Sequence, residues 1–287
     1  MNRMVRVGGH LSIRKGFAGA ALAAAAQGAG VFQYFPKNPR SLSVKQVDPR
    51  DAERCKVLCG EKEIVSVAHT PYPSNLALEP VTQKEARSKV VDSLRNDLEI
   101  AEACGSLGIV VHFGSSRDGN PLQIYKNIIQ CINEVLQGWK GNALLLLENQ
   151  AGDHGEEGKT LEEMVQIRKL CERPEHIGFC LDTCHAFAAG IWGGAGDTAF
   201  LDKARDLNYF EALKVLHFND SKYPAGSRKD RHARVGTGHI GEAGFRWLLS
   251  IPELKGLPLV LESETGRDGT YMQDMHQIEL WSEAGLE

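Results

Sequence analysis

The sequence of 287 residues lacks long apolar runs, and no stretch approaches the roughly 18 consecutive apolar residues of a membrane-spanning helix. It also lacks an excess of charge of either sign, because 33 lysines and arginines stand against 37 aspartates and glutamates, a formal net charge of −4. This balance provides no overall basic surface for nucleic acid. Hydrophobic residues make up 42% and charged residues 24%, the proportions of a folded globular protein rather than a disordered one.

Two motifs are missing as well. The seven cysteines form an odd set without a paired C-x-x-C motif, so we expect free thiols in a reducing cytoplasm, in a bacterial-type protein whose substrate lies in the nucleoid. No G-x-G-x-x-G follows the first apolar run, which argues against a doubly wound sheet that binds a nucleotide cofactor. The alanine-rich stretch 16–30 loosely resembles a secretion signal, but alanine is only weakly apolar and we interpret the stretch as a helix.

Short apolar runs recur about every 30 to 40 residues, and each precedes a segment with helical spacing. The expected strands are 5–9, 31–35, 64–68, 109–113, 143–148, 177–181, 215–218 and 257–261. Expected helices include 81–107, 122–139, 161–171, 200–209, 243–249 and 271–281. The runs are apolar without alternation, as in a parallel sheet covered by helices on both faces. We therefore predict an α/β fold, a single (β/α)₈ TIM barrel over residues 1–287, with a doubly wound open sheet as the alternative.

Side chains of metal-ligand type follow seven of these runs. In a barrel of this kind the C-terminal ends of the strands form the active site, so these groups should converge. A single histidine there would normally be structural, but a group of carboxylates and imidazoles that meet at one mouth requires cations to offset their repulsion. The residues are His10, His69, His112, Glu148, Asp182 with His185, His217 and Glu262.

Two local patterns add to this prediction. Asp182 and His185 are three residues apart, which on a helical turn places both side chains on one side. Asp230 and His232 are two apart, which on an extended segment places both on one face. Cys184 could be a further, soft ligand, but we interpret it as a buried structural thiol.

The segment 221–234 is rich in basic residues around Asp230. A solvated face is one interpretation, and a rim that contacts phosphates beside bound metal ions is the other. Three divalent ions would add +6 to the net charge of −4 and bring it to about +2, which favours the second. The basic residues are Lys222, Arg228, Lys229, Arg231 and Arg234.

At these residues the sequence resembles the endonuclease IV family of apurinic/apyrimidinic (AP) endonucleases. The resemblance extends over nearly the whole chain, with the motifs in order and in register. They are G-H-L-S at 9–12, K-N-P-R at 37–40, H-T-P-Y at 69–72, V-H-F at 111–113, L-E-N-Q-A-G at 147–152, L-D-T-C-H-A at 181–186, H-F-N-D-S at 217–221, G-S-R-K-D-R-H at 226–232, G-T-G-H-I-G at 236–241 and L-E at 261–262.

The resemblance implies three zinc ions per chain, with Mn²⁺ as an alternative at one or more sites. It assigns the first to His69, His112 and Glu148. The second shares Glu148 and takes Asp182, His217 and Glu262, and the third takes His185, Asp230 and His232. All nine positions hold the expected residue types. His10 is expected to line the site without binding a metal.

The resemblance further implies a hydrolase of base excision repair, a metal-dependent endodeoxyribonuclease that acts as a monomer on double-stranded DNA. Divalent ions lower the pKa of bound water toward about neutral, and cleavage on the 5′ side of an abasic site would leave a 3′-hydroxyl. Trimming of 3′ blocking groups is a further expected activity. The catalytic residues would be Glu148 and Glu262, and the DNA-binding residues Arg40, Tyr72, Lys222, Arg228 and Arg231.

Two departures from the family pattern concern DNA recognition. Pro73 stands where an aliphatic wedge is expected, and Leu42 where many members have an aromatic residue. Two other functions remain open: a divalent-metal sugar isomerase or epimerase of the same superfamily, and a non-catalytic, metal-stabilised scaffold that binds DNA lesions. An isomerase has no use for a third metal site or for a basic loop, and the complete ligand set disfavours the scaffold.

Overall fold

Eight parallel strands form the centre of the structure, a computed structural model that describes residues 5–115, 120–153 and 155–283. All eight predicted strands are confirmed, with ends that differ by at most two residues. They are β1 (Arg6–Gly9), β2 (Val31–Tyr34), β3 (Val65–His69), β4 (Gly108–Val111), β5 (Leu144–Glu148), β6 (Ile177–Asp182), β7 (Leu213–His217) and β10 (Pro258–Leu261).

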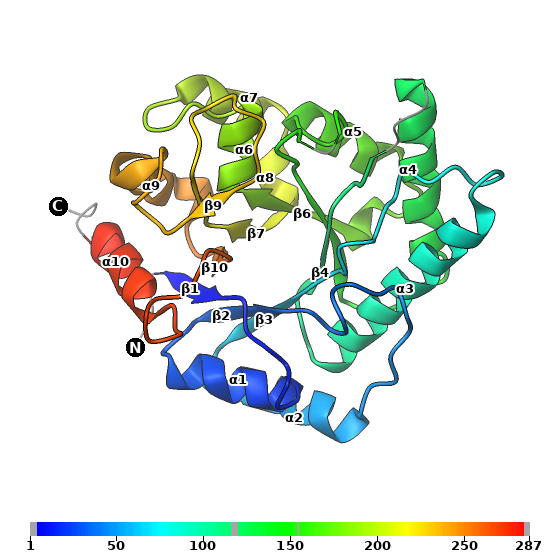
Figure 1. Cartoon of the computed structure of the whole chain (residues 1–287), viewed down its shortest axis with the longest axis horizontal. Helices are drawn as coiled ribbons and strands as arrows, with labels where there is room; N and C mark the ends of the chain where they lie inside the picture. The colour runs from blue at the N-terminus through cyan, green and yellow to red at the C-terminus, as the bar shows by residue number, and fades with distance from the viewer. Residues whose placement is uncertain (1–4, 116–119, 154, 284–287) are drawn as a thin grey trace.

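The strands close into a barrel. Their order is β1-β10-β7-β6-β5-β4-β3-β2, and each neighbouring pair is parallel. The seam between β1 and β2 is joined by the amide of Gly30, which donates to the carbonyl of Val7 (2.9 Å), and by a bridge between His10 and Gln33. Figure 1 shows the strands at the centre of a ring of helices. The barrel prediction is confirmed, and the open-sheet alternative is wrong.

The barrel interior is filled by one inward-facing side chain from each of seven strands. These residues form a cluster of their own, separate from the larger core between strands and helices: Val31, Val67, Val110, Leu146, Cys180, Val215 and Val260. Strand β1 contributes Gly8, where a Cβ atom would lie 1.7 Å from the carbonyl oxygen of Val31. Glycine is therefore required for β1 to approach β2 closely enough to close the barrel.

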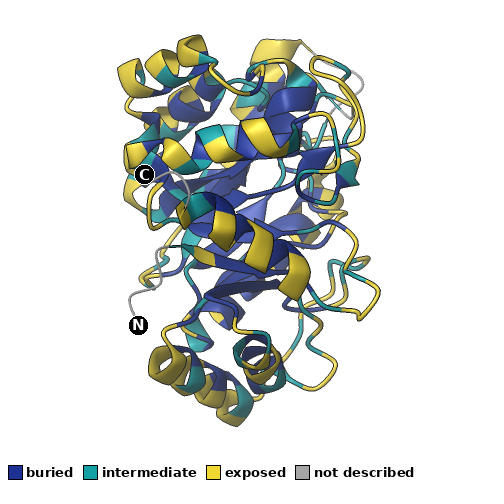
Figure 2. Ribbon diagram, turned by 90° about the vertical axis from the view of Figure 1, so that its left-hand side faces the viewer, coloured by how far each residue is buried: buried dark blue, intermediate teal, exposed yellow. Residues whose placement is uncertain are grey.

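Helices cover the outer surface of the barrel, with buried faces toward the strands and exposed faces toward solvent (Figure 2). The outer helices are α1 (Phe17–Ala26), α2 (Pro49–Lys62), α3 (Lys84–Ala103), α4 (Pro121–Leu136), α5 (Leu161–Leu170), α7 (Thr198–Asp206), α9 (Gly241–Ser250) and α10 (Met272–Glu283). Shorter helices are α6 (Thr183–Ala189), α8 (Tyr209–Ala212), η1 (Pro174–His176) and η2 (Pro252–Leu254). The alanine-rich stretch forms α1, as interpreted from its sequence.

Three features of the fold differ from the predicted elements. Helix α3 begins at Lys84 rather than at residue 81, because Glu79 accepts hydrogen bonds from the amides of Val81 and Thr82 and holds a turn there. Helix α2 was not predicted, since its buried face consists of small residues only. A two-stranded antiparallel hairpin, β8 (Asp220–Ser221) and β9 (His232–Ala233), was also missed, because two-residue strands leave no periodic pattern.

The structure also bears on the predictions about the cysteines and about membrane-spanning segments. All seven cysteines are free and buried, as expected from their odd number. No helix among the described residues combines the length and the apolar composition needed to cross a bilayer.

Candidate metal centre

The nine predicted ligands lie together at the C-terminal end of the barrel. Four of them are the last residues of their strands: His69 of β3, Glu148 of β5, Asp182 of β6 and His217 of β7. His112 and Glu262 come directly after β4 and β10, and His185 lies in the first turn of α6. The hairpin β8–β9 brings Asp230 and His232 back over the same mouth.

The turn from β6 to α6 explains how Asp182 and His185 come to face the same cavity. Asp182 is the N-cap of α6, and its Oδ1 accepts a hydrogen bond from the amide of His185 (2.8 Å). An N-cap carboxylate in this position stabilises the start of the helix. The helical-turn interpretation of this motif is confirmed.

Three imidazole and carboxylate groups form the first cluster, around one oxygen of Glu148. The Oε2 atom of Glu148 lies 2.8 Å from Nε2 of His112 and 3.5 Å from Nε2 of His69. The rings of His69 and His112 meet edge to face, with centroids 5.2 Å apart. Both nitrogens are therefore directed at the same point in front of Glu148.

The second cluster surrounds Nδ1 of His217 at the bottom of the site. This nitrogen is 2.9 Å from Oε1 of Glu148, 3.0 Å from Oε2 of Glu262 and 3.8 Å from Oδ2 of Asp182. His217 and Asp182 are fully buried. Glu148 thus belongs to both clusters, one oxygen in each.

The third cluster is closer to solvent. Asp230 lies between two imidazoles, with Oδ2 3.3 Å from Nε2 of His185 and Oδ1 3.2 Å from Nε2 of His232. Ligand atoms about 2.0–2.1 Å from a tetrahedral ion lie roughly 3.3 Å from one another. Within each of the three clusters, all ligand atoms fall within 4.8 Å of one another. The spacing fits one cation per cluster.

Unpaired buried polar atoms give an independent test of this fit. Among the described residues, Glu148 Oε2, His185 Nε2 and His232 Nε2 are buried without a well-aligned hydrogen bond, and their neighbours at 2.8 to 3.3 Å are other ligand atoms of the same clusters. The other ring nitrogens of His69 and His185 are occupied, because each Nδ1 donates to a backbone carbonyl at 2.8 Å, of Thr70 and of Asn149 respectively. Such hydrogen bonds fix the ring so that the free Nε2 faces a metal. The donor set therefore fits a metal centre.

The electrostatics of the cluster lead to the same conclusion. Burial disfavours charge on these groups and by itself would raise the pKa of Glu148. The charge and hydrogen bonds of His112 and His217 have a larger effect and hold this pKa well below its usual value. Glu148 in turn raises the pKa of His112, and Asp182 raises that of His185. The carboxylates are thus ionised, and positive charge must accompany them, as protons on imidazole or as cations.

Three buried amides support the ligands, and sequence reasoning missed all of them. Asn219 donates from Nδ2 to Asp182 (2.8 Å) and to Glu262 (3.1 Å). Asn149 accepts from the amide of Asp182 and donates to its carbonyl. Gln33, on β2, contacts Glu262 and His217. Asn149 and Asn219 lie within motifs noted above, but Gln33 has no signal in the sequence.

A cavity of about 440 Å³ opens above the ligands. Seven of the nine ligands line it, together with His10, Phe35, Tyr72, Arg231 and Tyr271. His10 is thus placed as expected, in the lining and outside the three clusters. Tyr72 is 68% exposed and its ring packs edge to face on Phe35, with centroids 5.3 Å apart.

Of the predicted DNA-binding residues, Tyr72 and Arg231 line the cavity, whereas Arg40, Lys222 and Arg228 lie outside its lining. Arg40 is exposed, and the carbonyl of its neighbour Pro39 accepts from the amide of Tyr72 (2.9 Å), which joins the two loops. Arg228 pairs with Glu156. Lys222 and Arg231 are exposed. Leu42 is half-buried against the core, and Pro73 is exposed beside Tyr72.

Other residues of the basic segment 221–234 are engaged elsewhere. Arg234 pairs with Asp274 on α10 (2.7 Å), and the ammonium group of Lys229 lies 4.2 Å above the ring of Tyr223. Cys184 is buried; its thiol contacts the carbonyl of Arg231 (3.8 Å) and lies within 4.8 Å of ligand atoms of Asp182 and His232, so the structural-thiol interpretation stays a prediction. The segment therefore leaves only part of its charge for a ligand.

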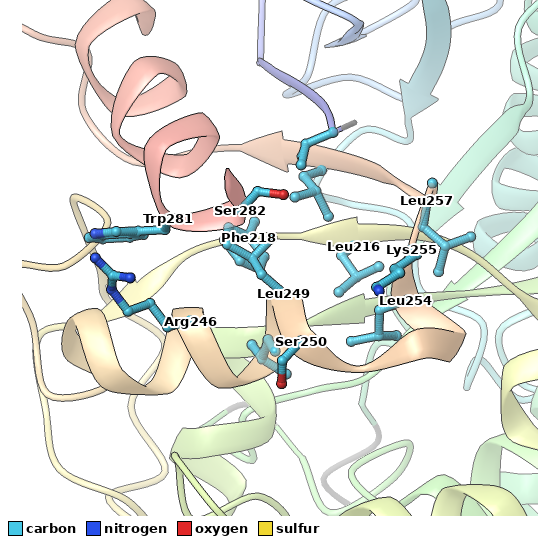
Figure 3. A pocket seen from close by; sticks show the side chains of 14 residues that line it. Leu216, Phe218, Arg246, Leu249, Ser250, Leu254, Lys255, Leu257, Trp281 and Ser282 are labelled. Atoms are coloured by element: carbon cyan, nitrogen blue, oxygen red, sulfur yellow. The ribbon is translucent and has the colours of Figure 1, made fainter. Parts of the chain in front are cut away.

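A second cavity, of about 270 Å³, lies outside the barrel wall between strands β7 and β10 and helices α9 and α10 (Figure 3). Its lining is mainly apolar, with Phe218, Leu249 and Trp281 among the side chains in view. No carboxylate, imidazole or thiol is present among the described residues that line it. The carboxylates and imidazoles that could bind metal are at the strand ends instead.

Comparison with known proteins agrees with the site. The family model described as a xylose isomerase-like TIM barrel matches residues 21–284. A protein named probable endonuclease 4 from Symbiobacterium thermophilum is 42% identical over 267 residues, which cover 93% of this chain and 96% of that protein.

Solved structures give a similar result. The crystal structure of endonuclease IV from Thermus thermophilus superposes with a TM-score of 0.85 at 34% identity, covering 97% of this chain and 99% of that one. A D-tagatose 3-epimerase-like protein superposes with a TM-score of 0.70 at 19% identity, covering 98% of this chain and 100% of that one. At that identity the second likeness shows the fold alone.

Proposed function

Because this chain belongs to the endonuclease IV family, and is therefore a metal-dependent DNA-repair endonuclease, we propose that it cuts duplex DNA on the 5′ side of abasic sites. The cut would leave a 3′-hydroxyl. The observation that supports this proposal most strongly is the grouping of nine imidazoles and carboxylates into three clusters at the ends of the barrel strands.

The three clusters would hold three divalent ions. Five imidazole nitrogens and four carboxylates form a donor set of nitrogen and oxygen that suits zinc, with manganese as the alternative. When bound, such ions lower the pKa of water and offset the negative charge of the phosphodiester. The residues of the chain hold and orient them: His69, His112 and Glu148 in the first cluster, Glu148, Asp182, His217 and Glu262 in the second, and His185, Asp230 and His232 in the third.

Glu148 and Glu262 are the proposed catalytic residues. Glu148 joins the first two clusters because its two oxygens face different imidazoles. Glu262 is held from both sides, by Gln33 at Oε1 (2.6 Å) and by Asn219 at Oε2 (3.1 Å). Glu262 also lines the cavity, whereas Asp182 and His217 lie beneath it. Among the second-cluster carboxylates that are not shared with the first cluster, it is therefore the one nearest to an entering phosphate.

Recognition of the lesion would depend on the rim of the cavity. The exposed Tyr72 and Arg40 lie on two loops that are joined by a backbone hydrogen bond, so they would enter the duplex as a unit. An abasic nucleotide is flipped out of the stack at low cost, because it has no base to unstack. Lys222, Arg228 and Arg231 are proposed to contact phosphates beside it.

A nicking assay tests the proposal. An end-labelled duplex with one stable abasic-site analogue should be cut once, on the 5′ side, and the new 3′ end should be extended by a DNA polymerase. The intact duplex of the same sequence is the control and should stay uncut. Binding without cutting, in the presence of Zn²⁺ or Mn²⁺, would support the lesion-binding scaffold, and isomerisation of a sugar would support the superfamily alternative.

The isomerase alternative has no specific support in the site. The third cluster, at the hairpin β8–β9, has a ligand set of its own beside the strand-end clusters, with Nε2 of His232 3.6 Å from Oδ2 of Asp182, and a one-ion or two-ion isomerase would not need it. The likeness to the epimerase-like structure concerns the fold, which is shared by many functions.

A further inference from the structure

We propose that Gln33 is a positioning residue of the metal centre, which determines that His217 presents Nδ1, not Nε2, to the second cluster. This inference rests on the metal centre of the proposed function. Gln33 lies on β2, fully buried, and its side chain points into the barrel beneath the ligands. It contacts Glu262, His10 and His217.

The three hydrogen bonds of Gln33 fix the orientation of its amide. Its Nε2 is 2.6 Å from Oε1 of Glu262, and an ionised carboxylate only accepts hydrogen bonds. The NH₂ group must therefore face Glu262, with its second hydrogen directed at Nδ1 of His10 (3.2 Å). The carbonyl oxygen then faces His217.

The orientation of this amide determines the protonation of the imidazole. Oε1 of Gln33 lies 2.8 Å from Nε2 of His217 and can only accept a hydrogen bond, so Nε2 must bear the hydrogen. In the neutral ring this leaves the lone pair on Nδ1, the atom that lies among the carboxylates of Glu148, Glu262 and Asp182. Gln33 thus directs the metal-binding nitrogen into the second cluster.

The other buried ligand histidines are oriented by hydrogen bonds to backbone carbonyls. Nδ1 of His69 and Nδ1 of His185 each donate to a carbonyl, so both rings present Nε2 to their clusters. His217 enters from β7 with the opposite ring orientation, and the hydrogen bond of its Nε2 goes to a side chain. The bridge between Gln33 and His10 also joins β2 to β1 at the seam of the barrel.

Substitution of Gln33 tests this role. Gln33→Met keeps the length of the side chain and removes all three hydrogen bonds. Loss of such a supporting hydrogen bond typically weakens metal binding by about 10–100-fold. We expect one of three zinc ions to be lost at a free zinc concentration about 10–100-fold higher than in the wild type, measured by metal analysis after dialysis against graded chelator.

Asn127→Leu is the matched control. Asn127 is also a buried amide, but it lies on the outer helix α4 and donates to the carbonyl of Ala77 (3.3 Å), and none of its described hydrogen bonds goes to a metal ligand. The Asn127→Leu protein should be less stable than the wild type but should not lose zinc selectively. Thermal melting of all three proteins separates loss of folding from loss of metal.

A second measurement requires no variant. In zinc-loaded wild-type protein labelled with ¹⁵N-histidine, His217 should show a slowly exchanging N–H at Nε2 and a metal-shifted Nδ1. An N–H on Nδ1 instead, or unchanged zinc retention in Gln33→Met, would overturn the role of Gln33. Failure of the wild-type protein to bind zinc at all would overturn the proposed metal centre itself, so the two failures are distinguishable.

Discussion

Each carboxylate oxygen of Glu148 faces two imidazoles. Oε2 lies near His69 and His112, and Oε1 lies 2.9 Å from His217 and 3.4 Å from His185. With its side chain 1% exposed, Glu148 depends on these neighbours to be ionised. A change at this one carboxylate therefore affects two clusters at once.

Replacement of Glu148 by glutamine is predicted to reduce nicking of abasic DNA by more than about 100-fold, because the amide removes the shared negative charge from two clusters. Binding of the same duplex should remain measurable, since the rim residues are unchanged. Glu264→Gln, an exposed acid just beyond Glu262, should cut at the wild-type rate. Gel assays of cutting and of binding provide both readouts, and an active Glu148→Gln protein would exclude the bridging role.

The ligand residues could be predicted because their chemistry and their position after apolar runs are both visible in the sequence. The amides that orient them could not. Gln33 lies inside a strand, where a lone polar residue is indistinguishable from one that faces solvent. Its role depends on contact with Glu262, 229 residues away, and one-dimensional patterns do not report such contacts.

The loop between β2 and α2, at the rim of the cavity, is held in place by a neighbouring helix. It contains Arg40, and helix α3 fastens it at two points. Lys37 donates to the carbonyl of Ser93 (2.8 Å) and lies 3.0 Å from Asp97, and the side chain of Asn96 bonds to both backbone groups of residue 45. Anchors of this kind order a loop without secondary structure before it meets DNA.

The pair formed by Lys37 and Asp97 predicts a pH dependence of stability. Burial raises the pKa of Asp97 from 3.8 to about 7, and Lys37 offsets only part of this effect. A carboxyl group whose pKa is higher in the folded chain than in the unfolded chain makes its full contribution to folding stability below the pKa of the unfolded chain. This contribution is lost as the pH rises through the pKa of the folded chain. The free energy of unfolding of the wild type, compared with that of Asp97→Asn, should therefore decrease by about 1.4 kcal/mol per pH unit between about pH 5 and 7.

Urea denaturation of both proteins across this range measures the difference. Asp92→Asn, an exposed acid on the same helix, is the control and should give a difference that does not vary with pH. A constant difference between wild type and Asp97→Asn would show that Asp97 is ionised throughout as the partner of Lys37.

Elements with strong periodicity were predictable and weakly patterned ones were not. The strands are continuous apolar runs, so all eight could be located. Helix α2 buries only Ala52, Cys55 and Cys59 and has no apolar stripe to detect. The hairpin β8–β9 exists because Asp220 and Ser221 pair with Ala233 and His232 across the basic segment, a tertiary contact that the sequence does not reveal.

At the scale of the whole molecule, the barrel brings together ligands from positions 69 to 262 of the chain. Their carboxylates concentrate negative charge at one end of a protein whose formal net charge is −4. Three divalent ions would change this total to about +2 and place the added charge at the mouth, where a DNA backbone must approach. The fold thus accounts for an acidic protein with a polyanionic substrate.

The central claim is that the nine residues hold three metal ions, and anomalous scattering tests it most directly. Crystals of the zinc-loaded protein, measured on both sides of the zinc absorption edge, should show three difference peaks at the strand ends. One peak should lie at each cluster, with Glu148 shared between two of them. A single peak, or peaks away from these residues, would contradict the account.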